Sequence, residues 1–142
     1  MNIYSFTDST YSKPNINFDD KWPVQFIEGF SKFYNNYHHN KVIIVEDPQS
    51  ATYIPIRIFH VKQFRFGQIL HAPVSNAEEL NAVNQVEFLN KLIAFIKSKK
   101  IIHRLIQPHP FGIMLGVPNN AASCEFGTYI TPLSGNDDET LL

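Results

Sequence analysis

The sequence predicts a single α/β domain, residues 1–142, with a mixed and largely antiparallel sheet flanked by two main helices. Two segments, 23–37 and 75–100, carry apolar residues at helical spacing. Runs rich in isoleucine and valine lie between and after them and indicate strands. At 142 residues, with 44% hydrophobic and 18% charged residues, the chain is long enough to bury a core.

The first helix is expected over residues 23–37. Phe26, Phe30, Phe33 and Tyr37 share one face at this spacing. Pro23 suits a first turn, because its missing N–H would have no helical partner there. We therefore expect an amphipathic helix with an aromatic face.

Three strands in a β-meander are expected next. The runs 41–46, 52–60 and 65–71 are β-branched or alternate apolar and polar residues. Pro55 lacks a backbone N–H, so it favours an edge strand or a bulge.

The second helix is expected to begin at Ser75, which forms a capping box with Glu78. It ends near three lysines, at 97, 99 and 100, which complement the helix dipole. The run 101–107 then predicts a buried strand that follows this helix as a crossover requires. A last strand is expected over 126–133, before a polar tail at 134–142.

Charge and composition exclude several function classes. Twelve basic and 13 acidic residues give a net charge of −1, so there is no strong nucleic-acid signal and no global attraction to an anionic membrane. A single cysteine, no signal-peptide pattern and no apolar run of about 18 residues favour a cytoplasmic protein without a membrane span.

No catalytic constellation can be read from the residues. Cys124 lies in no known cysteine-enzyme motif, the six histidines lack metal-site spacing, and no glycine-rich phosphate loop is present. We expect no metal and no cofactor, and the catalytic residues stay unassigned. Five residues on or beside predicted strands could line a groove for an anionic small molecule or precursor, although ordinary surface charge explains them too. They are Arg57, Arg65, His71, Arg104 and His109.

The order of elements and several short motifs resemble a known family. TYIPIRIFHVKQFRFGQILHAPVS, RLIQPHPFG and EFGTYITPLS, within residues 20–134, are similar to the N-terminal, GNAT-like subdomain of Fem-type (FemAB-like) peptidoglycan aminoacyltransferases of bacteria. The resemblance implies a GNAT-like fold. It also implies transfer of an amino acid from aminoacyl-tRNA to the amino group of a cell-wall precursor, in a cleft that two subdomains share.

Two hypotheses of different classes follow. In the first, the chain is one lobe of a Fem-like acyltransferase acting on an amine-bearing cell-wall or related precursor, completed by a second GNAT-like subdomain. In the second, it is a non-catalytic binding or assembly module with a GNAT-like fold, whose partner is another copy of the chain.

Overall fold

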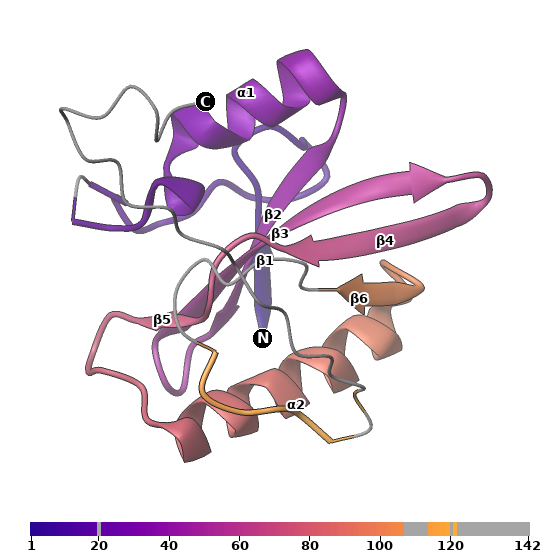
Figure 1. Cartoon of the computed structure of the whole chain (residues 1–142). Helices are drawn as coiled ribbons and strands as arrows, with labels where there is room; N and C mark the ends of the chain where they lie inside the picture. The colour runs from indigo at the N-terminus through magenta and orange to yellow at the C-terminus, as the bar shows by residue number, and fades with distance from the viewer. Residues whose placement is uncertain (20, 107–113, 120, 122–142) are drawn as a thin grey trace, which may run out of the picture.

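A computed structural model describes residues 1–19, 21–106, 114–119 and 121 of the chain. In chain order, its elements are β1 (Asn2–Tyr4), the 3-10 helix η1 (Val24–Phe26), α1 (Glu28–His38), β2 (Lys41–Asp47), β3 (Thr52–Val61), β4 (Phe64–Ile69), β5 (Val74–Ser75), α2 (Ala82–Lys99) and β6 (Arg104–Ile106). Helix α1 covers one face of the sheet and α2 the other, so three layers result (Figure 1).

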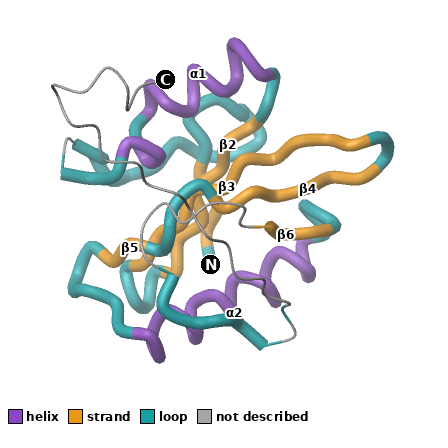
Figure 2. Tube along the Cα trace, in the orientation of Figure 1, coloured by secondary structure: helices purple, strands orange, loops and turns teal. Residues whose placement is uncertain are grey.

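Within the described residues, the sheet has six strands in the order β1-β2-β3-β4-β6, and β5 pairs with β3 beyond the end of β4. The β1–β2, β2–β3, β3–β4 and β3–β5 pairs are antiparallel, whereas β4 and β6 are parallel. Helix α2 connects these two parallel strands, as such a pairing requires (Figure 2). The predicted fold class, a mixed and largely antiparallel sheet with two main helices, is confirmed.

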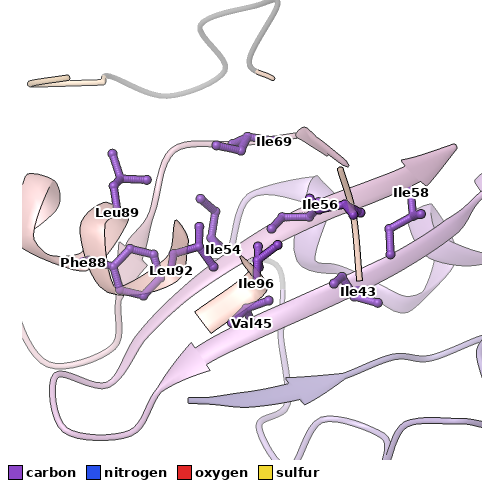
Figure 3. Close-up of a cluster of buried hydrophobic side chains, with 11 residues drawn as sticks. Ile43, Val45, Ile54, Ile56, Ile58, Ile69, Phe88, Leu89, Leu92 and Ile96 are labelled. Carbon is purple, nitrogen blue, oxygen red and sulfur yellow. The ribbon is translucent and has the colours of Figure 1, made fainter. Parts of the chain in front are cut away.

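The larger core lies between the sheet and α2. Alternate residues of β2, β3 and β4 point toward α2. The helix packs four buried apolar side chains, at helical spacing, against them. Figure 3 shows them meeting: Ile43, Val45, Ile54, Ile56, Ile58 and Ile69 from the strands, and Phe88, Leu89, Leu92 and Ile96 from α2.

A smaller aromatic core lies on the α1 side of the sheet. Phe18, Phe26 and Tyr53 are buried there with Ile44, and Trp22 packs against them. Trp22 meets Phe18 and Tyr53 edge to face, at centroid distances of 4.7 and 5.7 Å. Such pairs stabilise beyond the area that they bury.

The first helix is shorter than the sequence predicts. Ile27 is extended, with φ −79° and ψ 142°, and separates η1 from α1. Because of this break, the aromatic face is not continuous on the sheet. Phe26 is fully buried from η1, while Phe33 and Tyr37 of α1 are 48% and 74% exposed.

The second helix begins later than predicted, and the capping box at Ser75 is wrong. Ser75 belongs to β5, where it pairs with Thr52. Its Oγ accepts from the N–H groups of Ala77 and Glu78 and so closes a turn after the strand. The N-cap is Asn81, whose Oδ1 accepts from the Asn84 N–H at 2.8 Å.

Pro55 is not in an edge strand, because β3 pairs with β2 on one side and with β4 and β5 on the other. The carbonyl of Pro55 accepts from Leu70 N, just after β4 ends and before β5 begins. In a strand the N–H and C=O of one residue point to the same side. The missing N–H therefore faces the interruption between β4 and β5, where no ladder hydrogen bond is lost.

The strand expected over 101–107 is reduced to β6, Arg104–Ile106. The strand expected over 126–133, the tail 134–142, Cys124 and His109 lie outside the described residues.

Candidate functional site

The structure does not bring the five predicted site residues together in one place. Arg65 and Arg104 line a common groove. Arg57 contacts Tyr34 of α1, on the other face of the sheet. His71 follows β4 at its carboxyl end, and His109 lies outside the described residues.

The groove that contains Arg65 and Arg104 is called the basic groove below. It has a volume of about 470 Å³ and lies between the C-terminal part of α2 and the amino ends of β4 and β6. Its lining is formed by Arg65, Ile93, Ile96, Lys97, Lys100, Ile102, His103, Arg104 and Leu105. Cationic side chains therefore border an aliphatic surface.

Arg65 ties the end of α2 to the sheet. Its Nε donates to the Ile101 carbonyl and its Nη2 to the Lys100 carbonyl, each at 2.8 Å. These carbonyls follow the helix, where acceptors have no helical donor. The Arg65 backbone N–H donates to His103 Nδ1 at 2.9 Å, and the His103 N–H donates back to the Arg65 carbonyl at 2.8 Å. Arg65 thus shapes the groove as well as lining it.

Sequence reasoning missed three lining residues of the basic groove. Lys97 and Lys100 were explained by the helix dipole alone, and His103 by its place in a strand. The signal that could have found them is local: cations at the end of a helix, followed within four residues by His103 and Arg104 at the start of the next strand. A tight connection of this kind keeps these four side chains at one edge, where Arg65 of β4 joins them.

Arg57 lies among aromatic rings on the α1 side of the sheet. Its Cζ is 5.3 Å from the Tyr34 ring centroid and 4.9 Å from that of Phe59. Phe59 is itself stacked on Phe66 across the β3–β4 hairpin, at 5.6 Å and 17°. Arg57 Nε is buried without a hydrogen-bond partner within the part of the chain that the structure describes. The guanidinium is planar, and its contacts with the two rings fix the orientation of that plane. Its remaining N–H groups are therefore directed as the binding of a carboxylate or phosphate requires.

His71 is half-buried at the carboxyl end of β4. Its Nδ1 is 2.8 Å from the Ala72 carbonyl, and its ring is 6.1 Å from that of Phe26. A carbonyl only accepts, so in this contact Nδ1 carries the proton, which leaves Nε2 as the acceptor of the neutral ring.

The carboxylate of Glu46 lies on the α1 side of the sheet, where two tyrosine hydroxyls surround it. Glu46 accepts from the hydroxyls of Tyr4 at 2.7 Å and Tyr53 at 3.0 Å, and from Asn2 Nδ2 at 3.2 Å. Burial alone raises the pKa of Glu46, but the hydrogen bonds from Tyr4, Asn2 and Tyr53 hold it below its ordinary value. The pKa of Tyr53 is raised, first by burial and then by its bond to Glu46, and that of Tyr4 is raised chiefly by its bond to Glu46. At neutral pH this cluster is one carboxylate held by two protonated phenols, and it stabilises the β1–β2–β3 part of the sheet.

A second cavity, of about 340 Å³, lies between the β2–β3 turn and the start of α2. Its buried carboxylate, Asp47, accepts from Gln49 N and Ser50 Oγ and pairs with Lys91 Nζ at 3.5 Å. Unlike the basic groove, this cavity is lined by more acidic than basic side chains, with Asp47, Glu78 and Glu87 beside Lys91.

The described residues contain no cluster of three or more His, Cys, Asp or Glu side chains that could hold a metal ion. They also contain no helix with the length and apolar character needed to span a membrane.

No protein-family model matches the chain, and no curated protein matches it significantly. Among solved structures, it is similar to one described as "Crystal structure of a probable acetyltransferase". The two chains are 10% identical, with a TM-score of 0.38, and the likeness covers 75% of this chain and 76% of that one. A TM-score of this size does not establish a shared fold.

Proposed function

We propose that the chain is one GNAT-like lobe of a Fem-like acyltransferase, acting on an amine-bearing cell-wall or related precursor. The observation that carries the proposal is the parallel pairing of β4 and β6 beside antiparallel strands. In open α/β sheets, ligands bind beyond the carboxyl ends of parallel strands, where the direction of the connections changes. Here that place is the carboxyl end of β4 and β6, and a second lobe would complete it.

Arg57 is the proposed substrate contact at this end. It pairs with Gln68, the penultimate residue of β4, and faces the α1 side with an unpartnered Nε in the described part of the chain. A carboxylate or phosphate of the precursor would bind its planar N–H groups with directional, charge-assisted hydrogen bonds. Such binding orients an amine for attack, which is the main contribution that an acyltransferase site makes without a covalent intermediate.

His71 is the proposed general base. As the amine attacks the acyl carbonyl of the donor, the amide bond forms and the bond from that carbonyl to the ester oxygen or thioester sulfur of the donor breaks. The amine loses a proton in this step, an imidazole nitrogen is suited to accept it, and the proton can then pass to the leaving oxygen or sulfur. The contact between Nδ1 and Ala72 leaves Nε2 as the acceptor, and Phe26 limits rotation of the ring.

The test is calorimetric binding and acyl transfer with a muramyl pentapeptide acceptor and either an aminoacyl-tRNA or an acyl-CoA donor. We expect Arg57→Gln to weaken acceptor binding about tenfold, the loss of one partly solvent-screened charge-assisted contact. Lys21→Gln removes the same charge from an exposed site and serves as the matched control. We expect His71→Asn to lower the transfer rate with little effect on acceptor binding.

Mass spectrometry of the acceptor measures transfer directly, as the added mass of the acyl group. The proposal is refuted if the wild-type chain binds neither acceptor nor donor, or if Arg57→Gln and Lys21→Gln bind the acceptor equally well.

The alternative, a non-catalytic assembly module, is favoured by one observation. Phe33 and Tyr37 of α1 and Val61 and Phe64 at the β3–β4 turn are 48%, 74%, 48% and 47% exposed. Exposed apolar side chains of this size are typical of contact surfaces. Under this alternative, light scattering detects a dimer of the wild-type chain, and Phe33→Ser with Tyr37→Ser returns it to a monomer.

A further inference from the structure

The basic groove concentrates positive charge that no ion pair among the described residues neutralises. Arg65, Lys97, Lys100 and Arg104 are four of the twelve lysine and arginine residues of the chain. Among the described residues, no acidic side chain is part of the lining. The ion pairs between described residues lie elsewhere, at Lys32, Lys41 and Lys91. A chain with a net charge of −1 therefore carries a local site with a strong preference for anions.

The position at the end of α2 explains only part of this charge. Lys97 and Lys100 complement the helix dipole, as cations do near many helix ends. Arg104 is exposed and comes from β6, together with His103. His103 accepts the Arg65 N–H through Nδ1, so in the neutral ring Nε2 carries the proton and is a further donor. Donors thus converge from the helix and from two strands.

The rest of the lining is aliphatic. Ile96 and Ile102 are buried beneath the groove, and Ile93 and Leu105 are half-exposed beside the cations. A volume of about 470 Å³ is within the range of small-molecule sites, which are largely apolar with a few directed polar groups. A ligand that fits has a compact, highly charged head and an apolar portion next to it.

We propose that the basic groove binds a diphosphate group that bears an apolar substituent. Four cationic side chains match a multiply charged head better than a single carboxylate, and Arg and Lys are the usual phosphate contacts in proteins. This site stands apart from the proposed acyltransferase site, because it lies at the amino ends of β4 and β6 and on the α2 side of the sheet. Either proposal can fail without the other.

The experiment uses inorganic pyrophosphate and geranyl pyrophosphate in calorimetric titrations at low ionic strength. We expect both to bind with one site per chain. Geranyl pyrophosphate should bind about tenfold more tightly, because its apolar groups leave water against the half-exposed side chains of Ile93 and Leu105. The variant Lys97→Gln with Arg104→Gln should weaken both ligands about tenfold or more, since it removes two exposed cations while Arg65 keeps α2 in place.

The control variant, Lys13→Gln with Lys21→Gln, removes the same charge from exposed positions outside the groove. It should bind both ligands as the wild type does. Equal weakening by the two variants overturns the proposal, because the affinity would then follow net charge alone. Absence of binding of both pyrophosphate and geranyl pyrophosphate also overturns it.

Two further arms test other anionic partners. Vesicles of phosphatidylglycerol, whose headgroup carries one phosphate, are compared with vesicles of phosphatidylcholine. Flotation with phosphatidylglycerol that depends on Lys97 and Arg104, without binding of pyrophosphate, overturns the proposal in favour of an anionic membrane surface. Binding of a single-stranded RNA that depends on Lys97 and Arg104, without binding of pyrophosphate or vesicles, overturns the proposal in favour of a nucleic-acid surface.

Discussion

Replacing Glu46 by Gln tests the carboxylate cluster that joins β1, β2 and β3. The carboxylate accepts three hydrogen bonds, two from tyrosine hydroxyls and one from Asn2. Glutamine keeps one acceptor oxygen but turns an amide donor toward the other partners. Hydrogen bonds to a charged group contribute about 1.5–3 kcal/mol each. Because Glu46 is half-exposed, we expect a loss of about 1–2 kcal/mol in the free energy of unfolding, at the lower end of that range.

The pH dependence separates the charge from the shape of the side chain. The pKa of Glu46 is lowered in the folded state. Its stabilising contribution is therefore present above the unfolded pKa of about 4.3 and is lost as the pH falls through the lower folded value. The difference between wild type and Glu46→Gln should be full at pH 7 and should shrink progressively as the pH falls below the unfolded pKa of about 4.3.

Urea unfolding followed by circular dichroism at several pH values measures this difference. At neutral pH it corresponds to a decrease of about 2–8 °C in the melting temperature. Glu79→Gln, at an exposed site before α2, is the matched control and should leave the unfolding curve unchanged. If the difference between Glu46→Gln and wild type is the same at pH 3 as at pH 7, the ionised carboxylate is not its source.

Two further substitutions test the packing around β4 and the start of α2. A Cβ at Gly67 would collide with Ile102 Cδ1 and come within 3.2 Å of Ile56 and Leu105 side chains, so Gly67→Ala should lower the free energy of unfolding by about 1–3 kcal/mol. Its urea midpoint measures this loss, and a midpoint equal to that of the wild type contradicts the packing described here. Asn81→Ala removes the N-cap of α2 and should cost about 0.5–2 kcal/mol. The sequence alone identifies Ser75 as the cap, so Ser75→Ala is the comparison, and it should not reduce the hydrogen-exchange protection of α2. If Ser75→Ala lowers that protection and Asn81→Ala does not, Asn81 is not the N-cap.

The elements that could be predicted are those whose local pattern agrees with their packing. In α2, Leu89, Leu92 and Ile96 lie on the face that the periodicity indicates, and that face is buried against the sheet. The central residues 42–45 of β2 are apolar on both faces because both faces are covered. At these positions the apolar side chains are favourable only when buried, so the sequence pattern is enough to predict the helix or strand.

The predictions that failed depend on pairing between distant residues. Ser75 has the spacing of a cap, but pairing with Thr52 places it in β5. Pro55 is typical of an edge, but the interruption between β4 and β5 gives its missing N–H a harmless position inside the sheet. Sequence spacing alone contains no information on which distant strand competes for these residues.

The predicted site residues show the same limit. Arg57 and Arg65 are eight positions apart on neighbouring strands. The sequence-based prediction assigned both to one groove because both are arginines on predicted strands. The hairpin register pairs Arg65 with His60 and Arg57 with Gln68, so the two arginines contact opposite layers of the molecule. Substitutions at Arg57 and at Lys97 with Arg104 should therefore act independently, because groups on opposite faces without shared partners have additive effects. If Arg57→Gln weakens pyrophosphate binding as much as the change at Lys97 and Arg104 does, the two faces belong to one site, and the separation of the two proposals is wrong.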